Sequence, residues 1–255
     1  ISADEPGQHS SQNEQDNRHY AKAARLPMFE PSDSQECLDM VKTAFELSQT
    51  LDLPVMIRLT TRVCHSKSIV YTARREEVAI RGYQKDVTKT ITVPAMARGL
   101  RLTLEKRVDR ARECAESSAF NRAETGDGKI GVITSGVCYY YSKEVFGETA
   151  SYLKLGMSWP LPDKLITDFC RSVETVYVVE ENDPYIEDEV RGLGFAPHGR
   201  DTFPFCGELT PDVLRRSLHG EPRPTLDYDR TKVLPRPPML CAGCPHRGLF
   251  YELGK

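Results

Sequence analysis

The sequence predicts an α/β protein with parallel, doubly wound sheets, and three observations support this fold class. Short runs rich in Val and Ile, such as "GVIT" and "TVYVV", are typical of strands buried on both faces. Segments with helical periodicity alternate with these runs along the chain. The connections are short, and parallel strands can be joined only through a crossover, so we expect helices to cover both faces of each sheet.

The composition is that of an ordinary soluble globular protein. The chain has 255 residues, of which 39% are hydrophobic and 28% charged, enough for one large domain or two modest ones. A net charge of −3 gives no argument for nucleic acid or a membrane surface as a partner. We find no apolar run near the roughly 18 residues of a spanning helix, and no secretory signal. The eight cysteines are mostly scattered singly, which predicts free thiols and a cytoplasmic location.

The first predicted unit begins with the end of a strand, "ISADEPG", and a polar loop that leads into a helix near Asn13. A clearer helix is predicted within residues 30–51, where Ser32 with Gln35, or Asp33 with Glu36, has capping-box spacing. We expect its apolar stripe to comprise Leu38, Val41, Ala44, Phe45 and Ser48. A buried strand follows at 55–60, and then a loop that carries Arg62 and His65.

A charged segment, residues 76–128, separates this unit from the next. From Pro94 onward it has helical periodicity, and its mixed charges predict one long, solvated helix. The turn-forming residues "ETGDGK", 124–129, mark the end of the segment.

The second predicted unit contains strands at 129–136, 153–162 and 175–182, with helices at 137–146, 163–173 and 182–190. We expect Asp163 and Asp183 to cap the last two helices, and Pro184 to occupy the first position of the last one. Glu187 in its first turn suits the helix dipole.

Two features of this unit allow a functional interpretation and a structural one. The Ser135-Gly136 turn before a helix is a possible anion site, but it lacks a G-x-G-x-x-G or Walker pattern, which favours a structural turn. Glu180, Glu181 and Asp183 have the chemistry of acid/base groups or metal ligands. Helix initiation and capping explain these three carboxylates more simply.

Residues 207–235 are Pro-rich and predict an extended linker. The linker leads to "CAGC", in which Cys241 and Cys244 have the spacing of a metal chelate or a redox pair. Structural zinc and iron–sulfur clusters need further ligands, and within this chain His246 is too close to be a second knuckle. The pair is therefore either structural or part of a site whose other ligands lie beyond Lys255. Both ends look cut through structure, so we expect a piece of a longer polypeptide.

Several strings, in one order, resemble the large (alpha) subunit of indolepyruvate ferredoxin oxidoreductase. This subunit belongs to the thiamine-diphosphate-dependent 2-oxo-acid:ferredoxin oxidoreductases. The resemblance covers essentially the whole chain. The strings are "ADEPGQHSSQNEQDNRHYAK", "PVMIRLTTRVCHS", "WPLP", "VVEENDPYIEDEV" and "RPPMLCAGCPHRGLFYEL".

The resemblance implies a domain layout. Residues 1–75 correspond to the second part of a pyrimidine-binding domain, and 129–206 to a transketolase C-terminal-like domain. Residues 76–128 are a helical connection, 207–235 a linker, and 236–255 the start of a diphosphate-binding domain. The glutamate that activates the aminopyrimidine is then expected upstream of Ile1. The Mg2+ and diphosphate motif and the ferredoxin-like cysteines are expected downstream of Lys255, so this chain alone should not bind thiamine diphosphate.

The implied reaction is CoA-dependent oxidative decarboxylation of an aryl 2-oxo acid, indole-3-pyruvate to indole-3-acetyl-CoA and CO2, with ferredoxin as electron acceptor. Thiamine diphosphate, Mg2+ and [4Fe-4S] clusters are the implied cofactors. A small (beta) subunit, ferredoxin and CoA are the implied partners. Alternatives are a pyruvate or other 2-oxo-acid ferredoxin oxidoreductase, and a non-catalytic transketolase-C-type module that partners another thiamine subunit.

The resemblance also implies site residues, although it names no catalytic residue in this chain. The loop after the first strand faces substrate in the family, so the residues expected to line the cofactor site are His9, Ser10, Ser11, Gln12 and Asn13. His246 is expected near the cofactor diphosphate. Cys241 and Cys244 occupy the place of a cluster-binding C-x-x-C in related enzymes, where a Gly follows the second Cys instead of Pro245. Cluster ligation and a purely structural turn therefore both stay open for this pair.

Overall fold

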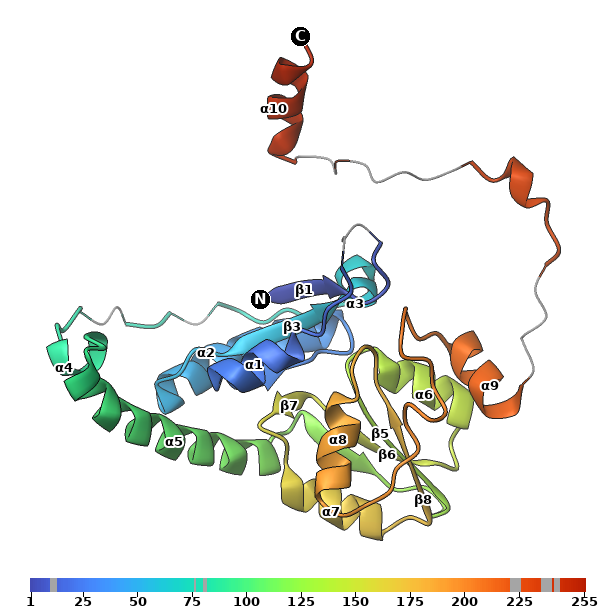
Figure 1. The fold of residues 1–255 in the computed structure, drawn as a ribbon, viewed down its shortest axis with the longest axis horizontal. Helices are drawn as coiled ribbons and strands as arrows, with labels where there is room; N and C mark the ends of the chain where they lie inside the picture. The colour runs from blue at the N-terminus through green and yellow to red at the C-terminus, as the bar shows by residue number, and fades with distance from the viewer. Residues whose placement is uncertain (10–12, 76, 80–81, 221–225, 235–239, 241–243) are drawn as a thin grey trace.

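A computed structural model of the chain describes residues 1–255 except 10–12, 76, 80–81, 221–225, 235–239 and 241–243. The described residues form two four-stranded sheets (Figure 1). The first contains, in spatial order, β1 (Ser2–Glu5), β3 (Met56–Thr60), β2 (Met28–Phe29) and β7 (Met157–Trp159). The second contains β4 (Asn121–Glu124), β6 (Ser151–Leu155), β5 (Ile130–Ser135) and β8 (Thr175–Val179).

Each sheet is parallel apart from one edge strand. Strand β3 pairs in parallel with β1 and β2, and β5 pairs in parallel with β6 and β8. Strands β7 and β4 pair antiparallel with β2 and β6. The parallel prediction is thus confirmed for three strands of each sheet, and the antiparallel edges are additions to it.

The strand expected at 153–162 divides at Gly156 into β6 and β7. A Cβ at this glycine would lie 2.7 Å from the carbonyl oxygen of Phe120, so no side chain fits between the two backbones. After Gly156 the chain leaves the second sheet, and Met157–Trp159 pairs with β2 in the first. Strand β7 therefore ties the two sheets together.

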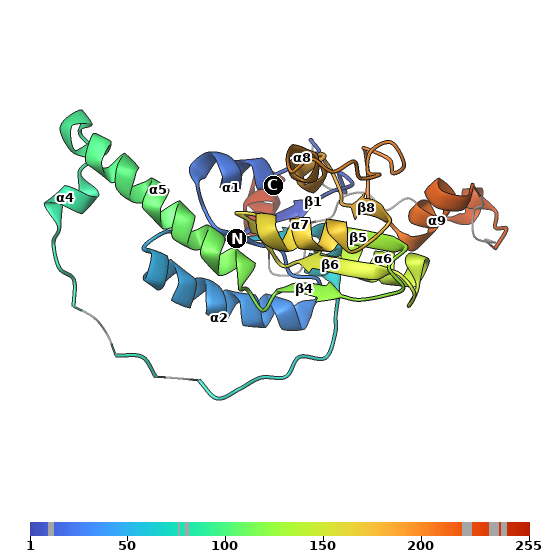
Figure 2. The ribbon, with the colours of Figure 1, turned by 90° about the horizontal axis from the view of Figure 1, so that it is seen from below.

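Helices cover both faces of the second sheet, as predicted (Figures 1 and 2). Helices α6 (Cys138–Phe146) and α9 (Pro211–His219) pack on one face, and α7 (Asp163–Arg171) and α8 (Tyr185–Gly192) on the other. Neighbouring residues of each strand alternate between these faces, as a pleated strand requires. The α6/α9 face buries Val132, Tyr152 and Val179, and the α7/α8 face buries Ile133, Leu153 and Val178.

The first sheet carries α1 (Arg18–Ala24), α2 (Ser34–Leu51) and α3 (Thr61–His65). Helix α2 begins as predicted, because the Asp33 carboxylate accepts a hydrogen bond from the Glu36 amide at 2.8 Å. The predicted stripe of α2 is partly wrong. Met40 and Ala44 face the core, whereas Phe45, one residue further around the helix, is 72% exposed. Helix α1 begins at Arg18, later than the expected start near Asn13.

The segment between the sheets contains the long helix predicted from Pro94, α5 (Pro94–Glu116), preceded by the short helix α4 (Val87–Thr90). The last turns of α5 bury Val108, Ala111 and Ala115 near α2, α7 and β7. Before α4 the described residues run as extended chain outside both sheets (Figure 2). Strand β4 was not predicted, since "NRAE" has no apolar alternation and its structure comes from pairing with β6.

Three expectations about helix ends and the linker are wrong. Helix α9 lies inside the segment expected to be an extended linker: Thr210 caps it, Pro211 is at its start and Leu214 is fully buried. Asp163 does not cap α7 and Asp183 does not cap α8, because Pro162 and Pro184 occupy those N-cap positions.

Helix α10 (His246–Leu253) lies apart from the sheets (Figure 1). Among the described residues, no helix has the length and apolarity needed to cross a membrane.

Candidate functional site

A cavity of about 300 Å3 lies where the loop after β1 meets the loops after β8. It therefore lies outside the carboxyl ends of strands from both sheets, the usual place for ligands in open α/β sheets. Its lining is rich in hydrogen-bond acceptors and consists of Gln8, Asn13, Glu14, Asp16, Asn182, Asp183, Phe205 and Cys206.

Buried Arg18, the first residue of α1, joins the two sides of this cavity. Its Nη1 donates to Glu180 Oε2 at 2.6 Å, and its Nε donates to Asp16 Oδ1 at 2.9 Å. Its Nη2 donates to the carbonyl oxygen of Glu181 at 2.7 Å. Burial alone would raise the pKa of Asp16, but the charge and hydrogen bonds of Arg18 lower it to about 2. Asp16 is therefore a carboxylate at any physiological pH.

Glu180 connects the end of β8 to the start of α8. Its carboxylate accepts hydrogen bonds from the amides of Ile186 and Glu187 at 2.9 and 3.0 Å, as well as from Arg18. Burial raises the pKa of Glu180, and the Arg18 guanidinium opposes that shift. For Glu180 the structure supports the helix-capping interpretation. Its carboxylate, which lies before α8 in the chain, caps the first turn of α8, and Asp183 does not.

A second buried arginine, Arg58 of β3, also connects the first sheet to the loop after β8. Its Nη1 donates to Glu30 Oε2 at 2.6 Å and its Nε donates to Asn17 Oδ1 at 2.9 Å. Its Nη2 donates at 3.1 Å to the side chain of Asn182, which lies in the loop after β8 and has a positive φ of 64°. The two arginines thus fix the loop after β1 against the loop after β8.

Residues 207–209, which we call the strap, close one side of the site through three consecutive contacts. Glu14 accepts from the amides of Gly7 and Gly207, at 2.8 and 3.1 Å. Glu208 lies 3.2 Å from His9 Nε2 and accepts from Arg62 Nη2 at 2.7 Å. The remaining contact joins the amide of Leu209 to Glu181.

Glu181 is a buried carboxyl behind the strap. Its Oε1 accepts from the Leu209 amide at 3.0 Å. Burial raises the pKa of Glu181 to about 7, although that hydrogen bond and the charge of Arg58 favour the ionised form. Glu181 therefore changes its protonation state near neutral pH, unlike Asp16 on the opposite side of the cavity.

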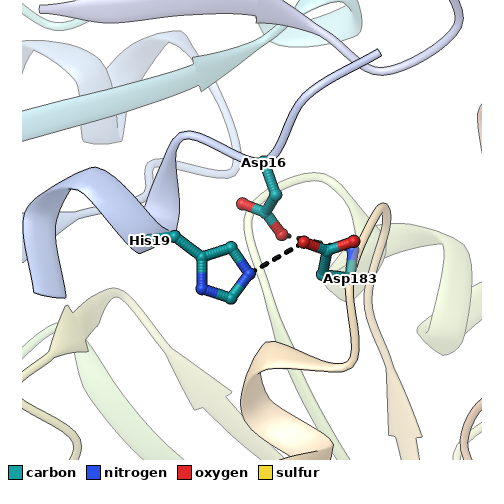
Figure 3. A group of neighbouring side chains, drawn as sticks. All are labelled: Asp16, His19 and Asp183. Atoms are coloured by element: carbon teal, nitrogen blue, oxygen red, sulfur yellow. Dashed lines mark hydrogen bonds and ion pairs between the residues drawn. The ribbon is translucent and has the colours of Figure 1, made fainter. Parts of the chain in front are cut away.

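Asp16, His19 and Asp183 are close enough to share a metal ion, since one ligand atom from each lies within 4.8 Å of the others (Figure 3). His19 Nε2 lies 2.8 Å from Asp183 Oδ2. Both oxygens of Asp16, however, already accept hydrogen bonds from Arg18. A guanidinium at this distance supplies the positive charge that a cation would bring, so the group acts as an ion-pair network.

The structure brings part of the predicted site together. Asn13 lines the cavity, and His9 is an exposed residue held by Glu208. Ser10, Ser11 and Gln12 lie outside the described residues, as does Cys241. Cys244 Sγ lies 3.4 Å from His246 Nδ1 at the start of α10, and that helix is separate from the cavity (Figure 1). The predicted roles of all of these residues stay predictions.

Four residues that organise the site were not predicted from the sequence: Glu14, Asp16, Arg18 and Arg58. The first two lie within the string "SSQNEQD", which was quoted for its resemblance to a known family, and that string was the available signal. Composition alone marks a polar run as a loop and does not distinguish its buried members from its exposed ones.

Comparison with known proteins finds close similarity along nearly the whole chain. The indolepyruvate oxidoreductase subunit IorA of Methanothermobacter thermautotrophicus is 40% identical over 270 residues, and that of Archaeoglobus fulgidus is 35% identical over 272. Each alignment covers 99% of this chain and 44% of the relative, so the chain spans less than half the length of these proteins. No protein-family model matches the chain.

Among solved structures, the fold is similar to a 2-oxoglutarate:ferredoxin oxidoreductase from Magnetococcus marinus with 2-oxoglutarate, coenzyme A and succinyl-CoA bound. The TM-score is 0.54, at 15% sequence identity, over 75% of this chain and 41% of that one. At this identity the likeness concerns the fold alone, and it confirms the α/β fold class.

Proposed function

We propose that this chain, a homologue of the indolepyruvate oxidoreductase IorA subunits along nearly its whole length, forms part of a 2-oxo-acid oxidoreductase. The observation that carries the proposal is the 40% identity over 99% of the chain, a span that includes the loop after β1 and both arginine networks. The solved structure of similar fold is, by its name, an oxidoreductase of a 2-oxo acid with ferredoxin, the same class of reaction that we propose.

The specific reaction that we propose is CoA-dependent oxidative decarboxylation of indole-3-pyruvate, with ferredoxin as electron acceptor and a small (beta) subunit as partner. The substrate is taken from the names of the relatives and the acceptor from the name of the structural neighbour. Because the chain spans 44% of its relatives, the reaction is proposed for the assembly that contains it.

Thiamine diphosphate is the proposed cofactor, and the polar side chains that line the cavity can be tested for their fit to it. The described lining presents the carboxylate of Asp183 and the side-chain amide of Asn13, beside the carboxylates of Glu14 and Asp16, which already accept hydrogen bonds from backbone amides and from Arg18. Acceptors of this kind suit the N–H groups of an aminopyrimidine. Among the described lining residues no Lys or Arg faces the cavity, so the lining fits the pyrimidine end of the cofactor and not its diphosphate. Bound thiamine would supply the electron sink for loss of CO2.

This chain's own residues would hold the rim of that site in place. Arg18 keeps Asp16 ionised and fixes the loop after β1 to β8, and Glu14 holds the Gly7 and Gly207 backbones together. Preorganisation of this kind aligns a bound group without a rearrangement during the reaction.

The proposed domain layout assigns residues 1–75 to the pyrimidine-binding domain and 129–206 to the transketolase C-terminal-like domain. The two separate sheets support this division, with β7 as the strand that crosses it. Mg2+ and [4Fe-4S] clusters are proposed cofactors of the assembly, with Cys241 and Cys244 as proposed cluster ligands. A cysteine thiolate is the usual ligand of an iron–sulfur cluster. The thiol of Cys244 lies beside the imidazole of His246 at the start of α10.

The decisive experiment compares substrates in the complete enzyme. The polypeptide that contains this chain is produced anaerobically with its small subunit, and reduction of ferredoxin or a viologen dye is followed with CoA present. We expect kcat/KM to be highest for indole-3-pyruvate. A clear preference for pyruvate or 2-oxoglutarate would refute the substrate assignment, and the absence of activity with every 2-oxo acid would favour a non-catalytic module.

A further inference from the structure

His9, in the loop after β1, is an exposed histidine whose ring is held from one side. Its Nε2 lies 3.2 Å from Oε2 of Glu208 in the strap, within reach of a hydrogen bond. The side chain of His9 is 47% exposed, whereas that of Glu208 is 11% exposed. A carboxylate beside one ring nitrogen fixes the orientation of a histidine and leaves the other nitrogen, here Nδ1, for a ligand.

Gly7 makes room for this contact. It has a positive φ of 99°, and a Cβ at this position would lie 2.8 Å from His9 Nε2 and 2.9 Å from Glu208 Cγ. A side chain at position 7 would therefore separate the imidazole from the carboxylate, in addition to straining the backbone. The close approach of His9 and Glu208 depends on glycine at this position.

Glu208 is itself held in place by its side chain and by its backbone. Arg62 Nη2 donates to Glu208 Oε2 at 2.7 Å, and this hydrogen bond, together with the charge of Glu208, raises the pKa of Arg62. The backbone amides of the residues on either side of Glu208 each donate to a carboxylate. The Glu208 side chain therefore meets His9 from a segment that is anchored on both sides.

The contact between His9 and Glu208 lies at the rim of the candidate cavity. Gln8, the neighbour of His9 in the chain, and Asn13, further along the same loop, both line that cavity. A 2-oxo acid is an anion, and among the described lining residues there are carboxylates but no Lys or Arg. A protonated histidine at the rim donates from both ring nitrogens, so it can bind Glu208 through Nε2 and an anionic ligand through Nδ1.

We propose that Glu208 is a positioning residue for the reaction proposed above. It orients the ring of His9 so that Nδ1 donates a hydrogen bond to the carboxylate of the bound 2-oxo acid. Glu208 acts through His9 and does not touch the substrate. The inference rests on the proposed function and adds to it a residue of the strap, about 200 positions further along the chain than the loop that it orients.

The first test measures steady-state kinetics with indole-3-pyruvate in the complete polypeptide with its small subunit. Glu208→Ala and His9→Ala should each lower kcat/KM at least tenfold, mainly through a higher KM, because the contact is to bound substrate. The double variant should lose no more than His9→Ala alone, since a positioning residue has no effect once the residue that it positions is gone. Glu208→Gln keeps an oxygen for the ring and should retain more activity than Glu208→Ala.

His198 provides the control for these variants. Its Nδ1 lies 3.0 Å from Oδ2 of Asp201, so it is another exposed histidine beside a carboxylate, and it does not line the cavity. His198→Ala should leave kcat/KM unchanged. A purely structural role of Glu208 would make the losses of Glu208→Ala and His9→Ala add in the double variant.

The second test measures the contact without the reaction, by modification with diethylpyrocarbonate, which reacts most readily at an accessible Nε2. The side chains of His9 and His198 are 47% and 49% exposed, but the carboxylate contacts Nε2 of His9 and Nδ1 of His198. Mass spectrometry of the peptides should therefore show slower modification of His9 in the wild type. Glu208→Ala should raise the rate at His9 at least threefold and leave the rate at His198 unchanged.

A pair of glycine variants tests the close approach at Gly7. Gly7→Ala should also raise the rate of His9 modification, because the methyl group separates His9 from Glu208. Gly194→Ala is the matched control, since Gly194 has a similar positive φ of 91° and no atom within 4 Å of its Cβ position. This control variant should modify His9 at the wild-type rate.

The outcomes separate this inference from the proposed function. An active wild type whose Glu208→Ala variant keeps full kcat/KM would overturn the role of Glu208 alone. Additive losses in the double variant, or equal modification of His9 in wild type and Glu208→Ala, would do the same. A wild type that is inactive with every 2-oxo acid would refute the proposed function and this inference together.

Discussion

Arg18 and Glu180 form a buried ion pair, with 2.6 Å between Nη1 and Oε2, that joins the start of α1 to the end of β8. The two residues are 162 positions apart in the chain, and both side chains are almost completely removed from solvent. Glu180 also caps α8, so one contact fixes the end of a strand, the start of two helices and one wall of the cavity.

Replacing Arg18 with Ala should strongly destabilise the protein. The change leaves Asp16 and Glu180 as buried carboxylates without their countercharge, for which we expect a loss of about 3–5 kcal/mol in the free energy of unfolding. Urea unfolding at pH 7 measures it. The control is Lys164→Ala, which breaks an exposed pair with Asp168 and should change the free energy of unfolding far less than Arg18→Ala does. Equal effects of the two changes would contradict the structural importance of the buried pair.

Glu181→Gln should change how stability depends on pH. Because burial raises the folded-state pKa of Glu181 to about 7, from an ordinary value of 4.5, the folded protein binds the proton more tightly than the unfolded chain. The wild type should therefore lose stability from this group as pH rises from about 4.5 to 7, and no further above that range.

The amide side chain of this variant stays neutral and keeps an oxygen for the Leu209 amide, so the variant should lack this loss. Between pH 5 and 7 the stability of Glu181→Gln relative to wild type should rise by about 2 kcal/mol, at about 1.36 kcal/mol per pKa unit. Asp188→Asn, at an exposed position, serves as the control. Parallel pH profiles for wild type and Glu181→Gln would show that Glu181 does not titrate in this range.

Gly156→Ala and Gly99→Ala should have opposite effects. At Gly156 the added methyl group meets the backbone of Phe120, so we expect a loss of about 1–3 kcal/mol. Gly99 lies on an open face of α5 with no atom near its Cβ position, so Ala should stabilise the helix by about 0.5–1 kcal/mol. Thermal unfolding of both variants checks the prediction, and a neutral Gly156→Ala would mean that the chain between β6 and β7 needs no close approach to Phe120.

The sequence predicts the parts of this fold that carry their own pattern. Strands β3, β5 and β8 and helices α5, α6 and α7 have apolar runs or stripes long enough to identify. Strands β2 and β4 have two and four residues, and only pairing with distant strands makes them strands. Strand β7 was expected as part of one strand at 153–162, and its pairing with β2 was not predicted. The Pro-rich composition after residue 207 concealed α9, although Thr210 and Pro211 are a normal helix start.

The residues of the candidate site also divide into those that the sequence indicates and those that depend on partners distant in the chain. The loop of His9 and Asn13 was expected at the site because the family that the chain resembles places this loop at the substrate, and Asn13 lines the cavity. Arg58 sits in an apolar strand and Arg18 follows a polar run, and neither position indicates a buried charge. Their role arises from Glu30, Glu180 and Asn182, partners that are distant in sequence.

Leu214→Ala should show that α9 is part of the second unit. Leu214 is fully buried against the α6 face of the sheet, so its truncation should cost about 2–5 kcal/mol in the free energy of unfolding. Leu226→Ala, at a position that is 90% exposed, should change stability by less than about 0.5 kcal/mol. A small effect at Leu214 would restore the linker interpretation for this segment.

Glu14→Ala and Glu14→Gln distinguish two roles of the Glu14 carboxylate. One is to hold the Gly7 and Gly207 backbones together by hydrogen bonds, and the other is to place a negative charge at the site. Oε1 of Glu14 accepts hydrogen bonds from both Gly7 and Gly207, and the Gln side chain keeps one such oxygen. In the complete enzyme we expect Glu14→Ala to weaken thiamine diphosphate binding about tenfold, equivalent to about 1.4 kcal/mol, because the loop and the strap separate. Glu14→Gln should retain most of the affinity if the clamp matters most. Calorimetric titration of each variant with the cofactor and Mg2+ measures this. Equal losses in both variants would instead assign the effect to the negative charge beside the aminopyrimidine.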